Sequence, residues 1–434
     1  MPATARRTIV AWTLYDFANS AFAAIVVTAV FPPYYADVVV GNAEGLGDRW
    51  WGRLVSTSMI LVALASPLLG GIADHAGARK PFLVGFTLLA VLATALLATV
   101  TQGMLLWGFV LGVTGFVAFE AAVVYYNAYL PRIAPPERLG RVSAAGFAVG
   151  YAGSLVAFAV ALPFARAEMY AACFVTAALQ FGLVAVPAFV WLPADARRSV
   201  PLATAVTRGL RETLATLREI VQNPERTAMR RFLLAYFVYE DGVNTVITVS
   251  GVFARTTLGF SFQDLIVLFL VVQITALLGS VAWARATDRR GPKFVVTTTL
   301  VQWIAVTTLA YFVVAKWQFW LVAVAAGTGL GAIQAASRTF MATLVPAGRE
   351  AEFFGFYSLV GKTGAIMGPL VFGELSAAMG GNQRIAIFAV GSFFLVGLLL
   401  LSRVRAGGPT AGSGPGSGPP ADVTPRLRRS DPPR

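Results

Sequence analysis

The chain has 434 residues, of which 57% are hydrophobic and only 13% are charged, and its mean hydropathy is +0.70. A soluble globular protein is about a quarter charged, so this composition excludes that class and indicates a polytopic membrane protein. The net charge of +13 does not indicate a nucleic-acid partner, because the basic residues lie in short turns between apolar segments, and the single Cys173 excludes an intramolecular disulfide and a multi-cysteine metal site.

Twelve segments are long and apolar enough to cross a bilayer as helices, which takes about 20 residues each. Their apolar runs are continuous and show no two-residue alternation, which favours helices over barrel strands. The sequence therefore predicts an all-α membrane protein. The predicted spans are residues 9–36, 53–73, 82–100, 103–130, 142–165, 170–192, 231–254, 264–286, 294–315, 318–344, 353–378 and 384–402.

The first predicted span carries a polar motif that the seventh repeats. Residues 16–20 and 241–245 both read D-x-x-N-[S/T] inside apolar segments. A carboxylate in hydrocarbon costs about 2.5–3.5 kcal/mol on insertion scales, so two in matching positions indicate a functional constellation. The first segment is also long enough to span and carries its own polar residues, so we predict a spanning helix and no cleavable signal peptide.

Basic connections after spans two and eight form a second repeat. Segments 71–80 and 284–293 carry Asp, Gly and basic residues in matching order. Glycine permits a tight turn, while Asp and Arg can form charge-assisted bonds across helix ends. We expect a gating role at the helix ends for these loop residues: Asp74, Gly77, Arg79, Lys80, Asp288, Arg290 and Lys293.

The repeats divide the chain into two halves that run parallel in sequence. Each half holds six predicted spans, so both halves have the same orientation, which predicts two pseudo-symmetric six-helix bundles. The predicted parts are an N-terminal bundle at 1–192, a linker at 193–230, a C-terminal bundle at 231–402 and a disordered cytoplasmic tail at 403–434. In the linker, apolar residues from 202 to 221 recur at helical spacing with arginines between them, which predicts an amphipathic helix on the membrane surface.

The distribution of positive charge predicts the orientation in the membrane. Of the 34 Lys and Arg residues, 27 lie in the two tails or in and near the even-numbered connections, whereas six lie in or near the odd-numbered connections. Cytoplasmic connections carry the excess of positive charge, so both termini are predicted to be cytoplasmic.

Polar side chains inside the spans predict a central site for a solute or a coupling ion. Asp16 and Asn19 share a helix face at i, i+3, and Asp241 and Asn244 repeat this spacing, with Glu240 next to Asp241 but on another face. A buried carboxylate can carry a proton, and an arginine suits a carboxylate-bearing solute. The alternative is a structural network that joins neighbouring helices, or, for Arg338, a place in the cytoplasmic loop network. The candidate residues are Tyr15, Asp16, Asn19, Glu120, Asn127, Tyr239, Asp241, Asn244, Arg338 and Lys362.

The segment Asp74…Gly77…Arg79-Lys80 resembles the loop signature of the major facilitator superfamily, and the copy at 288–293 is a degraded match. Within that superfamily, residues 12–22, 237–245 and 334–357 resemble the Atg22/UMF1 (vacuole effluxer-like) family. The resemblance covers about residues 8–402 and implies the MFS fold and a secondary transporter working as a monomer. Fungal relatives are associated with export of amino acids from the vacuole. The Ala/Arg-rich composition looks bacterial, so we expect the bacterial inner (plasma) membrane instead.

The predicted function is secondary-active transport of a small polar, amino-acid-like organic solute by alternating access, coupled to protons. Export is one of the two directions that the sequence leaves open. One histidine, one cysteine, no H-E-x-x-H and no phosphate-binding G-x-x-x-x-G-K-[ST] argue against an enzyme, a metal site or a cofactor. Two alternatives stay open from the sequence: another solute class, such as a sugar, peptide or drug, and a membrane sensor of the same fold that transports nothing.

Overall fold

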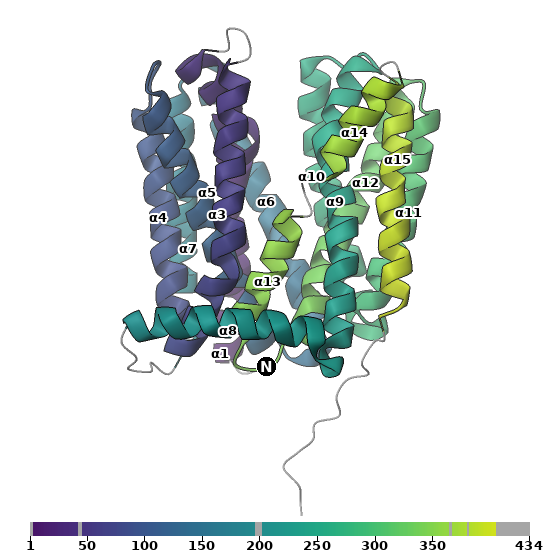
Figure 1. The fold of residues 1–434 in the computed structure, drawn as a ribbon. Helices are drawn as coiled ribbons and strands as arrows, with labels where there is room; N and C mark the ends of the chain where they lie inside the picture. The colour runs from purple at the N-terminus through teal and green to yellow at the C-terminus, as the bar shows by residue number, and fades with distance from the viewer. Residues whose placement is uncertain (1–2, 42–45, 196–201, 364–366, 380–381, 405–434) are drawn as a thin grey trace, which may run out of the picture.

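The computed structural model describes residues 3–41, 46–195, 202–363, 367–379 and 382–404. Within these ranges all regular secondary structure is helical, which confirms the all-α prediction (Figure 1). The first half contains α1 (Ala3–Phe22), α2 (Phe31–Pro33), α3 (Leu46–Ala76), α4 (Arg79–Leu96), α5 (Leu105–Ile133), α6 (Leu139–Arg166) and α7 (Tyr170–Trp191). Two π-helical segments, η1 (Ala23–Ala29) and η2 (Tyr34–Val40), flank α2 and continue the first span.

The second half follows a helix that crosses between the halves. This crossing helix is α8 (Leu202–Gln222). The second half contains α9 (Thr227–Thr256), α10 (Phe262–Arg290), α11 (Pro292–Phe312), α12 (Lys316–Leu344), α13 (Glu350–Thr363), α14 (Met367–Ala378) and α15 (Gln383–Ser402). Figure 1 shows the two bundles side by side, with α8 lying across one end of both. The predicted tail beyond residue 404 lies outside the described residues.

Ten helical segments among the described residues are long and apolar enough to cross a membrane. The two remaining predicted spans correspond to α9 and to α13 with α14. The 30 residues of α9 include Glu240, Asp241 and three arginines, which lower its hydropathy. The predicted span 353–378 is described as α13 and α14 on either side of residues 364–366. Helices predominate because no water reaches hydrocarbon, so backbone groups must bond within their own segment.

Local sequence signals set several helix ends. Ser261 caps α10, its Oγ accepting from the Asp264 N–H at 3.1 Å while the Asp264 carboxylate accepts from the Ser261 N–H at 2.9 Å. α11 begins with Pro292 directly after Gly291, whose φ of +84° is a conformation that glycine adopts without steric cost. These signals separate α10 from α11 at the predicted second loop motif.

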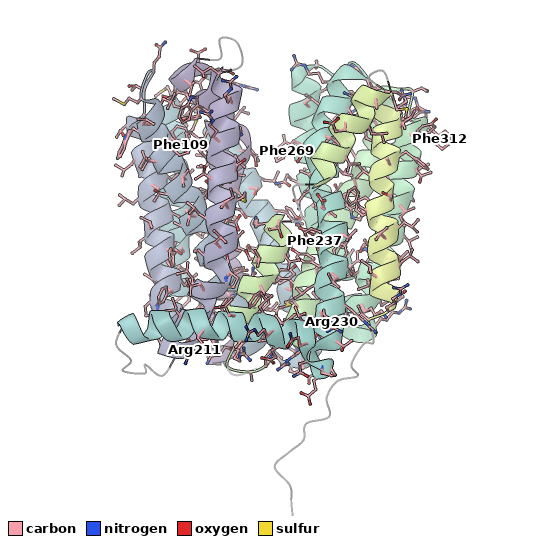
Figure 2. All side chains as sticks on the ribbon, in the orientation of Figure 1. Phe109, Arg211, Arg230, Phe237, Phe269 and Phe312 are labelled. Carbon is pink, nitrogen blue, oxygen red and sulfur yellow. The ribbon has the colours of Figure 1, made fainter. Side chains whose placement is uncertain are left out.

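The outer surface of both bundles is apolar, as contact with lipid requires. Phe312 is 66% exposed, and Figure 2 shows it on the outer flank of the second bundle, while Arg211 and Arg230 lie at the end where α8 crosses. Across the boundary between the halves, α3 packs against α13 and α6 packs against α10. The halves therefore meet directly through these helices, and the functional question is what lies between them.

Candidate functional site

A central cavity of about 1060 Å³ lies between the two bundles and is lined by side chains from both. Its lining follows α1 and η1 from Asp16 to Val27, and α9 from Tyr236 to Thr248. Both helices begin near α8 (Figure 1), so the cavity runs from the middle of the bundles toward the end remote from α8. The charged and amide residues that line it are Asp16, Asn19, Glu120, Asn127, Glu240, Asn244, Gln273, Gln334, Arg338 and Lys362.

The first ion pair of the cavity joins the two halves. Arg338 of α12 reaches Asp16 of α1, with Nη1 at 3.3 Å from Oδ2. The same guanidinium donates from Nη2 to the Ser143 carbonyl at 2.6 Å and stacks over the rings of Trp12 and Phe147 at 4.8 and 4.1 Å. A buried charge needs such compensation, and here it is supplied by the opposite half. Arg338 thus lies at the base of the cavity.

A second ion pair also crosses between the halves. Lys362 of α13 places Nζ at 2.6 Å from Oε1 of Glu120 of α5. Nearby, the Tyr151 hydroxyl of α6 donates to Oε1 of Gln334 of α12 at 2.5 Å. Glu120 and Lys362, isolated charges in apolar runs of the sequence, are therefore partners of each other. This ion pair and the Tyr151–Gln334 hydrogen bond both depend on how the two halves are placed.

Three predicted site residues do not line the cavity. The Tyr15 hydroxyl bonds to Thr87 at 2.6 Å inside the first bundle, and the Tyr239 hydroxyl bonds to Ser337 at 2.7 Å inside the second. Asp241 accepts the Gly368 N–H at 2.9 Å, so it joins α9 to α14. The predicted symmetry between Asp16 and Asp241 does not extend to the cavity wall, because Asp16 lines the cavity and meets Arg338 of the other half, whereas Asp241 is not among the lining residues.

Glu240 lines the cavity, although the sequence pattern had placed it on a different helix face from the predicted site residue Asp241. It shares the cavity with Asn244 and Tyr236, four residues to either side. Residues at i and i+4 occupy one helix face, so the spacing from Asn244 would have identified Glu240. Asp241 was favoured because it matches the repeated motif, yet it lies about 100° farther around the helix, as the 3.6-residue period of a helix requires.

The end of the molecule near α8 is closed by the predicted loop motif. Asp74 accepts Arg79 Nε at 2.5 Å and the Glu352 N–H of the other half at 2.9 Å. Arg79 in turn lies 2.6 Å from Glu350. Gly77 has φ of +60° at the turn, where glycine carries no steric penalty. We call Asp74, Arg79, Glu350 and Glu352 the closing network.

The second copy of the loop motif makes the equivalent contact, with the roles of the two halves exchanged. Asp288 of the second half accepts the Gly140 N–H of the first half at 2.7 Å and also pairs with Arg141. Lys80 donates to the Leu192 carbonyl at 2.7 Å, and Lys293 donates to the Val404 carbonyl. The two lysines therefore tie each loop to the end of the last helix of its own half. Arg290 has a different role, with its guanidinium 4.9 Å from the Phe294 ring.

α8 is attached to the closing network by its polar face. Thr216 donates to Glu352 at 2.5 Å, and Arg349 donates to Glu219 at 2.7 Å. Partial burial acts to raise the pKa of the Glu219 carboxyl, but hydrogen bonds from Arg349 and Arg226 outweigh it and hold that pKa below its usual value. Of the predicted apolar stripe, the described members Leu214, Leu217 and Val221 are exposed and face away from the bundles.

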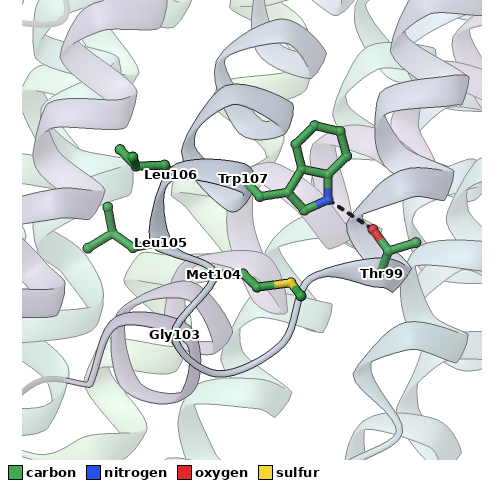
Figure 3. Close-up of a pocket in the computed structure, with 6 residues that line it drawn as sticks. All are labelled: Thr99, Gly103, Met104, Leu105, Leu106 and Trp107. Atoms are coloured by element: carbon green, nitrogen blue, oxygen red, sulfur yellow. Dashed lines mark hydrogen bonds between the residues drawn. The ribbon is translucent and has the colours of Figure 1, made fainter.

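A second, smaller hollow of about 440 Å³ lies where α4 ends and α5 begins. Trp107 Nε1 donates to Thr99 Oγ1 there at 3.0 Å (Figure 3). None of its lining residues is charged, so it offers no ionic contacts to a polar solute. Among the described residues, no group of three His, Cys, Asp or Glu side chains could hold a metal ion. The central cavity is therefore the candidate site.

The fold is shared with solved transporters. The human organic anion transporter MFSD10 (TETRAN) matches with a TM-score of 0.75 and 16% identity, covering 92% of this chain and all of that one. The proton:xylose symporter XylE matches with a TM-score of 0.73 and 13% identity, covering 93% and 96%. At these identities the likeness defines the fold alone, that of the major facilitator superfamily. The chain therefore has the MFS fold.

Sequence comparison defines the family within that class. The MFS-type transporter YxiO of Bacillus subtilis (strain 168) is 32% identical over 409 residues, 91% of this chain and 94% of the relative. Autophagy-related protein 22-1 of Penicillium rubens is 21% identical over 443 residues, 81% of this chain and 74% of the relative. The family model described as vacuole effluxer Atg22 like matches residues 53–407. The chain belongs to this Atg22-like family of MFS-type membrane transporters, as the motifs had indicated.

Proposed function

We propose that this protein is a secondary-active transporter that moves a small, amino-acid-like solute by alternating access, coupled to protons. The observation that carries the proposal is that both ion pairs of the cavity, Asp16 with Arg338 and Glu120 with Lys362, join opposite halves. A solute bound among them contacts both bundles at once. Rocking of the halves about that solute must break or exchange these pairs, which links binding to movement.

The chemistry of the cavity favours an organic ion over a neutral sugar. Carboxylates and cations stand within one cavity of about 1060 Å³, which leaves room for a solute of amino-acid size. An amino acid offers an ammonium group to a carboxylate and a carboxylate to Arg338, which can bind it in a bidentate manner. The family description, vacuole effluxer, supports export as the direction.

The charge distribution supports an orientation for this transport. With the excess of Lys and Arg on the cytoplasmic side, α8, both termini and the closing network face the cytoplasm. The cavity then opens to the outside in this structure. The Bacillus relative supports placement in a bacterial plasma membrane, with the exposed apolar residues of α8 in contact with lipid, and a single chain supplies both halves of the site as a monomer.

The test is a solute screen on purified protein followed by transport. Thermal shifts would be measured with amino acids, dipeptides, sugars, nucleosides and cationic drugs, since a ligand that binds only the folded state stabilises it by mass action. Solutes that bind would then be followed by counterflow in proteoliposomes. Asp16→Asn should lose binding and counterflow, whereas Asp37→Asn, at an exposed position outside the cavity, should retain both.

Two outcomes would contradict the proposal. If sugars or nucleosides bind and amino acids do not, the solute class is wrong. If no solute gives a shift or counterflow in the wild type, the protein is a non-transporting member of the fold, and the cross-half ion pairs are structural.

A further inference from the structure

The two ion pairs leave one charge of the cavity uncompensated. The described charged residues that line it are three carboxylates, Asp16, Glu120 and Glu240, and two cations, Arg338 and Lys362. Arg338 pairs with Asp16 and Lys362 with Glu120. Among the described residues, the Glu240 carboxylate has neither a hydrogen bond nor an ion pair, so the ionised lining carries a net charge of −1. A carboxylate in such a place needs one positive charge beside it.

Glu240 and Lys362 lie at the same depth on neighbouring helices of one half. The Tyr236 ring of α9 stacks on the Tyr357 ring of α13, with centroids 4.3 Å apart. Both helices run away from the α8 end, and one turn farther along them lie Glu240 and the pair Gly361-Lys362. The Lys362 ammonium thus stands between Glu120 of the other half, at 2.6 Å, and Glu240 of its own half, on which its charge also acts.

Among the residues that the structure describes, no other charged group compensates Glu240. Asp241, next to it in sequence, is directed at the Gly368 N–H rather than into the cavity. The remaining titratable groups within electrostatic reach of Glu240 are neutral phenols: Tyr236 and Tyr239 of α9, Tyr357 of α13 and Tyr151 of α6. Lys362 is therefore the one cation among the described groups that acts on Glu240, and Glu120 already holds it.

We propose that Glu240 is the site at which a proton and the ammonium group of a net-cationic solute, such as a basic amino acid, compete. Binding of the solute converts Glu240 from the carboxylic acid to the carboxylate paired with the ammonium group, and the released proton leaves to the water of the open cavity. One positive charge occupies the site in either case, so the transporter exchanges solute for protons. Lys362 is a positioning residue, because its pairing with Glu120 is what leaves Glu240 available.

This inference rests on the proposed transport function and predicts a specific preference. Lysine, leucine and glutamate are the probes, since they compare a net-cationic, a neutral and a net-anionic amino acid. Of the three, lysine should bind most tightly to the wild type. As the pH falls through the range in which Glu240 becomes protonated, its affinity should fall by up to about tenfold per pH unit. Binding of leucine should vary little over the same range.

Two variants should give one phenotype for different reasons. Glu240→Gln removes the site, and Glu120→Gln frees Lys362 to pair with Glu240. Both should weaken lysine binding at least tenfold and abolish its pH dependence. A purely structural role of Glu240 does not predict that a change on α5, in the other half, reproduces its loss. Glu374→Gln, at an exposed position of α14, is the matched control and should behave as wild type.

The outcomes separate this inference from the proposed function. Binding of amino acids without preference for lysine and without pH dependence would overturn the inference and leave the transport function standing. Wild-type pH dependence in Glu240→Gln, or unchanged lysine binding in Glu120→Gln, would also overturn it. Failure of the wild type to bind or transport any solute would instead refute the proposed function. Should Glu240→Gln fail to fold, Glu120→Gln alone decides.

Discussion

Closure of the α8 end depends on the lack of a side chain at Gly70. A Cβ at this position of α3 would lie 2.3 Å from the carbonyl oxygen and 2.7 Å from the carbonyl carbon of Ala351, in the other half. These are backbone atoms, which cannot rotate away as a flexible side chain can. At Gly71, the next residue, a Cβ would have as its nearest neighbour the Thr213 hydroxyl oxygen of α8. The distance of 3.4 Å is at the short end of ordinary van der Waals contact. Gly70→Ala therefore separates the halves at this end, and Gly71→Ala is the matched control.

The size of the shift that Gly70→Ala should cause depends on whether the clash is present when the α8 end is closed, when it is open, or in both states. Overpacking costs about 1–3 kcal/mol. The gain in helix propensity from glycine to alanine, about 1 kcal/mol, is present whether the α8 end is open or closed, so it cancels. The clash acts only when that end is closed, so the equilibrium should shift toward the alternative conformation by roughly 5- to 150-fold. Gly71→Ala should shift it by less than about twofold, as expected of a change within ±0.5 kcal/mol.

The shift can be measured as a distance between the halves at the remote end. Gln102 in the first half and Val314 in the second are both exposed there, and cysteines at these positions would carry spin labels in a Cys173→Ala background. Double electron–electron resonance should show a larger population of short distances in Gly70→Ala than in the parent. A folded Gly70→Ala protein with the parent's distance distribution, or an equal shift in Gly71→Ala, would refute the reasoning.

Two further predictions concern the charged contacts. Arg338→Met leaves Asp16 buried without its cationic partner and should destabilise the protein by about 3–5 kcal/mol in detergent unfolding. Adding Asp16→Asn should restore part of this stability, and equal loss in the single and double variants would contradict the pairing. The attachment of α8 through Glu219, whose folded pKa is lowered, should be complete above the ordinary glutamate pKa and lost as the pH falls through the lowered one. A spin label at Arg211→Cys should therefore gain mobility at acid pH. In Glu219→Gln the label should be mobile at neutral pH also, and immobility would contradict this role.

The class of protein and the repeated loop motifs could be predicted because their signals are local. Long apolar runs determine spanning helices through the cost of unpaired backbone groups in hydrocarbon. Asp74 and Asp288 were found by their spacing from glycine and basic residues, and both close the α8 end by accepting an N–H from the opposite half. A turn and its charged flank are encoded within ten residues, so the sequence suffices for them.

The candidate site was only partly predictable. Asp16, Glu120, Arg338 and Lys362 were identified as candidate site residues, because a lone charge in hydrocarbon is costly. The repeat also favoured Asp241 over Glu240, although only Glu240 lines the cavity. A repeated motif indicates what is common to the two halves. Here the common feature is that each Asp-bearing helix packs against a neighbouring helix of its own half. Gly150 lies against Asp16 in the first half, and Gly368 lies against Asp241 in the second.

The sequence by itself determined the membrane class, the helices, the duplication and the residues that must avoid lipid, since each depends on neighbours along the chain. Only the tertiary structure decided that Lys362 pairs with Glu120, that Arg338 pairs with Asp16 and that Glu240 is left over. These partners are 242 and 322 residues apart. Which charges meet depends on the rotation of each helix about its axis and the placement of one bundle against the other, and packing across the whole molecule sets both.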